Sequence, residues 1–285
     1  TMAVVQDKWH QKERLKEQGL EVPNFKKVDE VQDLVEFGQE HGWPVVLKKR
    51  KQGYDGKGNT TVHCAEASAE AWEHLGGAQN PLFVEAFCPF IKELAIMVIR
   101  TPSGLQATYP VVETEQKDHI CHTVCAPAQV ETPVKDRAQA LGIRAVEAVH
   151  GIGCFGVEMF LTAKGDLLIN ELAPRVHNSG HYTIEACPCS QFENHIRAIL
   201  DWPLGSTDLV RPTATMVNLL GKSEGPAMPS GMLECLQDPE THLHIYGKTH
   251  SKKGRKMGHL TLLGEDPEDI KVRAIGLAQS VQFGL

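Results

Sequence analysis

The stretch that decides the fold of this chain reads Gly156-Val157-Glu158-Met159-Phe160-Leu161 and then Leu167-Leu168-Ile169-Asn170-Glu171-Leu172-Ala173-Pro174-Arg175. Both runs have the composition of short strands, because β-branched and other apolar residues dominate them. The turn-forming residues Ala163-Lys164-Gly165-Asp166 join the two runs. The sequence therefore predicts an antiparallel hairpin at this point.

The register of this hairpin carries functional information. If Phe160 lies opposite Ile169, Glu158 lies opposite Glu171, and like charges directly across a strand pair cost up to about 1 kcal/mol. A bound cation offsets that repulsion, and carboxylate oxygens with the Asn170 amide beside them suit Mg²⁺. The alternative is that one glutamate is solvated at the sheet edge and the register slips by one residue. Pairing alone leaves both interpretations open.

Length, charge and cysteine spacing narrow the class of protein. A chain of 285 residues exceeds the usual single-domain size, so two or three lobes with sizeable cores are expected. The net charge of -7 argues against a nucleic-acid binder, and no run of about 20 uncharged apolar residues indicates a membrane span. The eight cysteines lack paired C-x-x-C zinc spacing. We expect a cytoplasmic protein with reduced thiols and neither a nucleic-acid nor a membrane partner.

Periodicity and turn residues divide the chain into elements. Helices are expected over residues 7–18, 28–40, 67–75, 134–149 and 191–200. A capping box of Ser190 with Glu193 opens the last of these helices. Besides the hairpin, strands are expected over residues 43–48, 60–64, 82–87, 93–100, 107–113, 242–246 and 258–263. The part after residue 205 should therefore be β-rich.

A glycine-rich loop follows the strand that ends near Lys48. It reads Gly53-Tyr54-Asp55-Gly56-Lys57-Gly58-Asn59, and its glycines let backbone N–H groups approach an anion while Lys48 and Lys57 supply positive charge. We expect a lid over nucleotide phosphates, although an ordinary glycine-rich turn explains the loop equally well. A Walker loop is excluded, because Gly58 follows Lys57 where Ser or Thr is needed. The G-x-G-x-x-G match at 151–156 opens a strand instead of a helix, which excludes a dinucleotide fingerprint.

These segments, in this order, resemble the ATP-grasp superfamily. More narrowly, Gly53 to Gly58 and Asn170-Glu171-Leu172-Ala173-Pro174-Arg175-Val176-His177-Asn178-Ser179-Gly180-His181 resemble the 5-(carboxyamino)imidazole ribonucleotide synthases of purine biosynthesis. The resemblance covers nearly the whole chain. It implies an α+β fold with an ATP-grasp domain over residues 1–205 and a small β-rich C-terminal domain over 206–285. Within the first domain, a lobe of about 1–80 would carry the lid and a lobe of about 81–205 the metal site.

The resemblance also implies a reaction, that of an ATP-dependent carbon-nitrogen ligase. ATP and bicarbonate would form carboxyphosphate, and the amine of 5-aminoimidazole ribonucleotide would then receive the carboxyl group, with release of ADP and phosphate. ATP and Mg²⁺ are the implied cofactors. Family members are often dimers, so the resemblance implies a homodimer as well.

Roles follow from the resemblance position by position. The implied ATP contacts are Lys8, Lys48, Gly53, Tyr54, Asp55, Gly56, Lys57, Gly58, Asn59, the hinge strand Glu85, Ala86, Phe87 and Cys88, and Glu93, Gln116, Asn170 and Glu171. Gln116 falls where many members have a histidine, and an amide still hydrogen-bonds but carries no charge. The implied Mg²⁺ ligands are Glu158, Asn170 and Glu171.

The implied acceptor side lies directly after the metal strand. Bicarbonate and the acceptor would meet the γ-phosphate at the catalytic residues Arg175, His177 and Asn178, and a bidentate Arg fork suits a planar anion. Lys248 and Arg255 match family positions that bind the acceptor phosphate. Tyr54 and Asp55 match lid residues that face its imidazole.

The chain departs from the family at its beginning. Members normally carry a Rossmann-like domain before the segment equivalent to Gln6-Asp7-Lys8, and that domain is expected to supply part of the acceptor site. Because Gln116 resembles the fungal-type relatives, which continue into a carboxylase domain, a piece of a bifunctional enzyme is one expectation. Another expectation is that the chain works together with a separately encoded N-terminal domain. The rival functions are an ATP-grasp ligase with another acceptor and an ATP-binding module without turnover.

Overall fold

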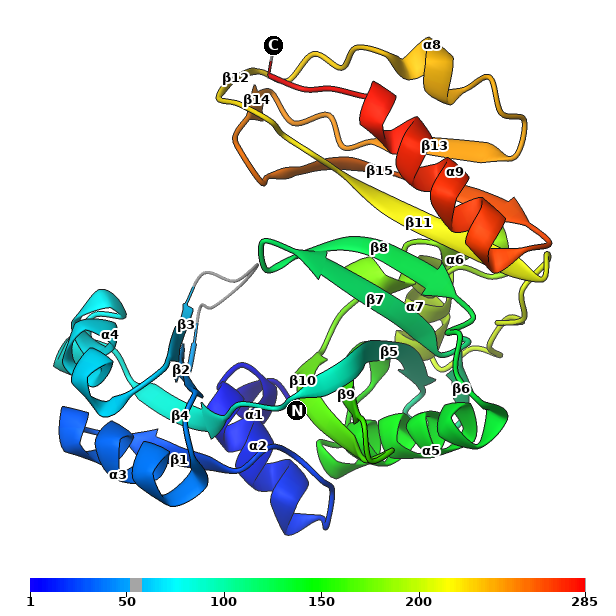
Figure 1. The fold of residues 1–285 in the computed structure, drawn as a ribbon. Helices are drawn as coiled ribbons and strands as arrows, with labels where there is room; N and C mark the ends of the chain where they lie inside the picture. The colour runs from blue at the N-terminus through cyan, green and yellow to red at the C-terminus, as the bar shows by residue number, and fades with distance from the viewer. Residues whose placement is uncertain (52–57, 285) are drawn as a thin grey trace.

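A computed structural model describes residues 1–51 and 58–284 of the chain (Figure 1). Its first sheet has four strands in the order β1 (Phe25–Val28), β4 (Leu82–Ala86), β2 (Val45–Lys49) and β3 (Asn59–Val62). Its large sheet has, in order, β10 (Leu167–Ala173), β9 (Gly153–Thr162), β5 (Phe90–Arg100), β7 (Val112–Lys117), β8 (Ile120–Ala126), β11 (Thr213–Leu220), β15 (Lys256–Gly264) and β13 (Thr241–Ile245). The mixture of helices and sheets confirms the expected α+β class.

The first sheet packs against two helices, α3 (Val31–His41) and α4 (Ser68–His74). Leu34 and Phe37 of α3 meet Val45 and Leu47 of β2 in a closed apolar core. The expected start of the helix at Val28 is wrong, because residues 25–28 form β1 beside β4. The helix begins only after a capping box at residues 30 and 33, which satisfies its first free N–H groups. Two 3-10 turns, η1 (Ala65–Ala67) and η2 (Gly77–Gln79), flank α4.

Helices cover both faces of the large sheet at β5. Leu94 and Ile96 face α5 (Thr132–Ala148), whereas Ala95 and Met97 face the side of α6 (Thr183–Ala186) and α7 (Gln191–Ile199). The helix α7 begins as expected, since the Ser190 hydroxyl accepts the N–H of residue 193. The Glu193 carboxylate binds Arg197 one turn later instead of closing the capping box.

The hairpin that decides the fold is present, with a bulge. Near the turn, Phe160 lies opposite Leu168, so the expected pairing of Phe160 with Ile169 is wrong by one residue. The register shifts between Ile169 and Glu171, and beyond this bulge Glu171 lies opposite Glu158 as expected. The bulge at Asn170 therefore restores the carboxylate pair that the simple register predicted.

The expected strand over residues 107–113 is two strands, β6 (Gln106–Thr108) and β7. Tyr109, Pro110 and Val111 separate them, and proline lacks the N–H that a central strand position needs. The strands β8 and β11, which the sequence did not predict, pair with each other, so the large sheet continues unbroken into the C-terminal part. That part also holds α8 (Met232–Cys235), α9 (Pro267–Ser280), and the short pair β12 (Gly225–Pro226) and β14 (His250–Ser251).

Two N-terminal helices, α1 (Met2–Val5) and α2 (Lys8–Glu17), lie between the first sheet and the hairpin of β9 and β10 in Figure 1. Asp7 begins α2 by accepting the N–H groups of Trp9 and His10. Gln11 joins the helix to the edge of the large sheet, because its side-chain amide exchanges hydrogen bonds of 2.8 and 2.9 Å with the backbone of Leu172. Among the described helices, none is both long and apolar enough to cross a bilayer.

Candidate functional site

The centre of the candidate site is the bulged hairpin of β9 and β10. The Lys8 ammonium at the start of α2 pairs with the Glu171 carboxylate. On the opposite strand, Glu158 accepts a 3.4 Å hydrogen bond from the Asn170 amide, and its other oxygen lies 3.6 Å from His177 Nε2. All three predicted metal ligands therefore lie on one small patch of the sheet.

The two carboxylates have opposite pKa shifts. Burial and the neighbouring Glu171 charge raise the pKa of Glu158 to about 7, although 34% of its side chain remains exposed. Burial also disfavours the ionised form of Glu171, but the Lys8 ammonium outweighs this and lowers the pKa of Glu171. The patch thus holds one carboxylate that is paired with a lysine and one whose ionised form is disfavoured, an arrangement that a divalent cation would stabilise.

The donor set fits Mg²⁺ better than a metal held only by protein. Across residues 1–51 and 58–284, no three His, Cys, Asp or Glu side chains are grouped to hold a metal ion. Mg²⁺ typically uses one or two carboxylates together with substrate phosphates and waters. Glu158 and Glu171, with the Asn170 amide, are the residues that could hold it and bring it to ATP oxygens.

A second charged cluster faces this hairpin from the first sheet. Glu85 of β4 is 2% exposed and lies between two ammonium groups, Lys48 of β2 and Lys12 of α2. The Lys12 Nζ lies 2.5 Å from Glu85 Oε1. Burial raises the pKa of Glu85, but both lysines outweigh burial and hold that pKa below its ordinary value. The strand β4 ends at Ala86, followed by the exposed Phe87 and the half-buried Cys88 of the predicted hinge.

Glu93 and Gln116 come together on neighbouring strands. The Gln116 amide hydrogen-bonds the Glu93 carboxylate, but burial and the nearby Glu158 charge still raise the pKa of Glu93 to about 7. Two predicted nucleotide-contacting side chains from β5 and β7 thus lie within electrostatic range of the predicted metal ligands. The amide at position 116 supplies a neutral donor in this crowded acidic environment.

The predicted catalytic residues follow β10 in a well-supported turn. Asn178 exchanges side-chain hydrogen bonds of 2.6 and 2.9 Å with Asn218 of β11. The backbone N–H and C=O of His177 bind the Gln191 amide at 2.9 and 2.8 Å. Arg175, in contrast, is exposed, and its guanidinium donates to the carbonyl of Val176. The turn is fixed by its neighbours while the guanidinium faces solvent.

The C-terminal basic residues lie on and beside β15. Lys248 Nζ lies 5.6 Å from the centre of the Tyr246 ring and donates to the Lys256 carbonyl at 2.5 Å. Arg255 donates to the carbonyl of His250 at 2.7 Å. Lys256 acts on the metal patch, because its charge lowers the pKa of Glu158 against the larger effect of burial. The C-terminal part is therefore close enough to contribute to the site.

The predicted lid is described only at its end. Gly53, Tyr54, Asp55, Gly56 and Lys57 lie outside the described residues. Gly58 has φ +110°, and its carbonyl accepts the N–H of Lys49 at 2.8 Å. Asn59 pairs with Lys48 across β2 and β3. The end of the loop thus returns directly to the strand that carries Lys48.

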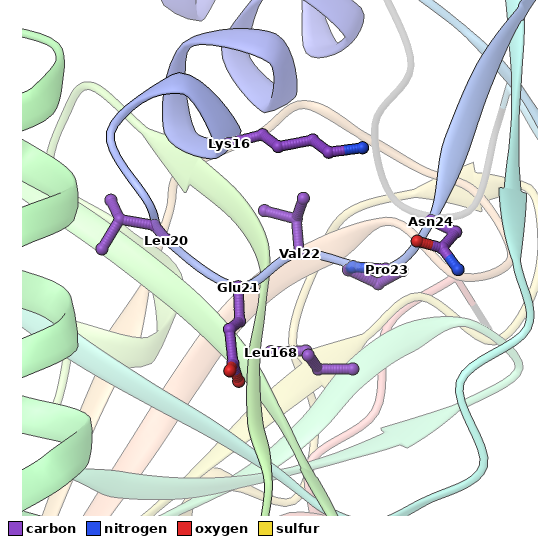
Figure 2. Close-up of a pocket in the computed structure, with 7 residues that line it drawn as sticks. All are labelled: Lys16, Leu20, Glu21, Val22, Pro23, Asn24 and Leu168. Atoms are coloured by element: carbon purple, nitrogen blue, oxygen red, sulfur yellow. The ribbon is translucent and has the colours of Figure 1, made fainter.

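Sequence reasoning missed three buried polar residues that support the site, Lys12, Gln191 and Asn218. A polar residue within an apolar strand pattern is the signal that could have found Asn218 in β11, because such residues are buried only with partners. No such signal marks Lys12 in the polar helix α2 or Gln191 at the first position of α7. The cavity in Figure 2 lies elsewhere, between the segment from α2 to β1 and Leu168 of β10. Lys16 and Glu21 line it together with apolar residues, and none of the predicted site residues does.

Comparisons with known proteins identify relatives. Residues 13–192 match the family model described as ATP-grasp domain, and residues 214–273 match the phosphoribosylaminoimidazole carboxylase C-terminal domain. A phosphoribosylaminoimidazole carboxylase of Schizosaccharomyces pombe is 43% identical over 278 residues, which are 96% of this chain and 50% of that protein. The chain thus spans half the length of this relative.

Two solved structures are similar over most of their length. The N5-carboxyaminoimidazole ribonucleotide synthetase of Thermotoga maritima is 41% identical with a TM-score of 0.88, and the match covers 99% of this chain and 73% of that one. The N5-carboxyaminoimidazole synthase of Aspergillus clavatus, in complex with ADP and 5-aminoimidazole ribonucleotide, is 35% identical with a TM-score of 0.89. That match covers 98% of this chain and 74% of the other.

Proposed function

Because this chain belongs to the ATP-grasp family, within the N5-carboxyaminoimidazole ribonucleotide synthases, we propose that it carboxylates 5-aminoimidazole ribonucleotide with ATP and bicarbonate. The observation that carries the proposal is the bulged hairpin. Its bulge sets Glu158 opposite Glu171, and Arg175 and His177 follow in the turn directly after β10. A phosphoryl-transfer centre and a site for a planar anion are thereby adjacent.

The residues of this site suit the proposed two-step chemistry. Lys8 and Lys48 carry the positive charge that ATP phosphates need, and Mg²⁺ bound at Glu158 and Glu171 would neutralise charge on the transferring phosphoryl group. Bicarbonate would accept that group to form carboxyphosphate, and the Arg175 fork would orient it. The acceptor amine would then take the carboxyl group and release phosphate.

The acceptor side extends toward β15 in this proposal. Lys248 and Arg255 would bind the acceptor phosphate, as at the equivalent family positions. His177 and Asn178 would line the place where the imidazole amine meets the activated carboxyl group. Support comes from the Asn178 to Asn218 pair, which ties this turn to the C-terminal strands.

Measuring phosphate release tests the proposed activity. The 285-residue chain would be assayed with ATP, Mg²⁺ and bicarbonate, with and without 5-aminoimidazole ribonucleotide. Release that depends on this acceptor supports the proposal. Tight ATP binding without release above background would instead support a nucleotide-binding module, and release stimulated by a different acceptor would support another ligase.

Several broader assignments are part of the same proposal. We place the ATP-grasp domain at residues 1–205, with lobes of about 1–80 and 81–205, and the acceptor-completing domain at 206–285. We also propose that the protein is a homodimer and is cytoplasmic. Its proposed partners are an N-terminal domain and a carboxylase domain, which is either fused or separate. The greater length of the Schizosaccharomyces pombe relative supports the idea of additional domains.

Metal binding should weaken as the pH falls below about 7. The pKa of Glu158 is raised to about 7, and a carboxylate must lose its proton to ligate a metal. The proton and the metal therefore compete below that pH, and affinity should fall about tenfold per pH unit while staying constant well above it. Calorimetric titration with Mn²⁺, without nucleotide, from about pH 6 to about pH 8 measures this dependence. An affinity that is independent of pH would refute the assignment of Glu158 as a ligand.

Replacing Lys248 by alanine should raise the KM for the acceptor by about tenfold or more. A charge-assisted hydrogen bond to phosphate contributes about 1.5–3 kcal/mol, and this variant removes it. The KM for ATP should change less than about twofold, since Lys248 does not belong to the ATP side of the proposed site. The exposed Lys253→Ala, five residues further on, is the matched control. Equal effects of Lys248→Ala on both KM values would argue against phosphate binding.

A further inference from the structure

Lys12 supports the candidate site, but the proposed reaction assigns it no role of its own. It projects from α2 and is 2% exposed, as is its partner Glu85. Its ammonium lies 2.5 Å from Glu85 Oε1 and donates a 3.4 Å hydrogen bond to the carbonyl of Ile169. One side chain thus connects the hinge strand β4 of the first sheet with the metal strand β10 of the large sheet.

The Lys12–Glu85–Lys48 triad has more positive than negative charge. Lys12 binds one oxygen of Glu85, and Lys48 binds the other. Lys8, at the start of the same helix, pairs with Glu171 instead of Glu85. One carboxylate therefore compensates two ammonium groups, and the triad holds one positive charge in excess.

Stability does not explain such an arrangement. Burial and the neighbouring Lys48 charge lower the pKa of Lys12 despite its contact with Glu85, so holding this ammonium here is unfavourable. Replacing a buried ion-pair member by an apolar residue of similar volume, together with its partner, is often neutral or stabilising. An excess buried charge is instead what an anionic ligand would compensate.

We propose that Lys12 is a positioning residue for ATP, whose ammonium neutralises Glu85 and thereby leaves the charge of Lys48 available to the nucleotide polyphosphate. Without Lys12, the Glu85 carboxylate would pair with Lys48 alone, and the two charges would cancel. Lys48, with 17% of its side chain accessible, is the least buried member of the triad and therefore the one that a phosphate can approach. The inference rests on the proposed ATP site but not on the carboxylation step.

The test compares binding of ATP and adenosine to the full chain by calorimetry. Lys12→Met should weaken ATP binding by about tenfold, because one positive charge close to the phosphates is lost. Adenosine, which has no phosphates, should bind as it does to the unchanged chain. A purely structural role of Lys12 would instead affect both ligands equally, or neither.

Two further variants control for charge and for folding. Lys16→Met removes the same charge from the same helix, at the exposed position seen in Figure 2, and should leave ATP binding unchanged. Lys12→Met combined with Glu85→Gln frees Lys48 from its partner and restores one excess positive charge. Because the adenine contact implied for the hinge strand uses its backbone, ATP binding should recover to within about threefold. This double variant buries no unpaired charge, which keeps the test independent of whether the single variant folds.

The inference is overturned if Lys12→Met leaves ATP binding unchanged or weakens adenosine binding as strongly. Failure of the double variant to recover ATP binding would overturn it as well. These measurements use binding alone, so they remain decisive if the carboxylation assay is negative. A negative carboxylation assay with the expected binding results would contradict the proposed function while supporting the role of Lys12.

Discussion

Replacing Glu171 by glutamine should lower turnover of ATP by about a thousandfold while leaving the fold intact. Glu171 is one of two carboxylates proposed to hold Mg²⁺, and metal stabilisation of the transferring phosphoryl group contributes several kcal/mol to the transition state. Glutamine keeps the shape of the side chain and removes one charge from the opposed pair with Glu158. Steady-state ADP formation at saturating Mg²⁺ measures the loss, and thermal unfolding checks the fold.

The control for this variant is Glu70→Gln, which removes a charge from the exposed face of α4. It should retain normal turnover. Unchanged turnover in Glu171→Gln would refute the metal assignment. A large loss of thermal stability would show that the pairing with Lys8 serves mainly to hold α2 against β10.

Replacing Arg175 by alanine should lower kcat/KM for bicarbonate by about a hundredfold or more. The guanidinium fork can form two charge-assisted hydrogen bonds to a planar anion, and alanine forms none. ATP affinity should change less than about twofold, and thermal stability should stay the same. Arg175 is exposed, and among the described residues its guanidinium donates only to the neighbouring carbonyl of Val176. Initial rates at varied bicarbonate, with ATP binding measured separately, distinguish these effects.

Arg175→Lys separates charge from geometry. Lysine keeps the positive charge but lacks the planar fork. The activity of Arg175→Lys should therefore lie between that of Arg175→Ala and that of the unchanged chain. Arg137→Ala, on the exposed side of α5, serves as the matched control. If Arg175→Ala weakened ATP binding as much as it slowed turnover, Arg175 would belong to the nucleotide site.

The hairpin was predictable because its strand composition, turn and opposed glutamates are all local in sequence. The bulge was not, since a one-residue shift at Asn170 depends on how β10 meets α2 and the segment that follows α2. The backbone N–H of Ile169 binds the carbonyl of Glu21, and that of Leu172 binds Gln11. Contacts between distant segments therefore set the register that a short pattern could only approximate.

The missed strands have a similar explanation. β1 consists of Phe25-Lys26-Lys27-Val28, whose two lysines break an apolar alternation, and it exists because β4 pairs with it. β8 and β11 are paired with each other across a long sequence separation. Strand pairing of this kind is decided by tertiary context more than by intrinsic propensity.

In the candidate site, too, some residues could be predicted from the sequence and others could not. The hairpin register located the two carboxylates, motif resemblance located Lys8 and Lys48, and these side chains lie close together in the structure. The supporting residues Lys12 and Gln191 were overlooked because their importance comes from buried partners on other elements. A sequence pattern shows that a polar residue is present, but only the fold shows what it contacts.

The most direct measurement of the central claim is transfer of labelled carbon from bicarbonate to 5-aminoimidazole ribonucleotide. The 285-residue chain would be incubated with ATP, Mg²⁺, labelled bicarbonate and the acceptor. The amount of ADP and the amount of labelled carboxylated acceptor would be measured in the same samples. The account predicts one labelled carboxyl group on the acceptor amine for each ADP formed. Formation of ADP without labelled nucleotide, or no reaction while ATP is bound, would contradict it.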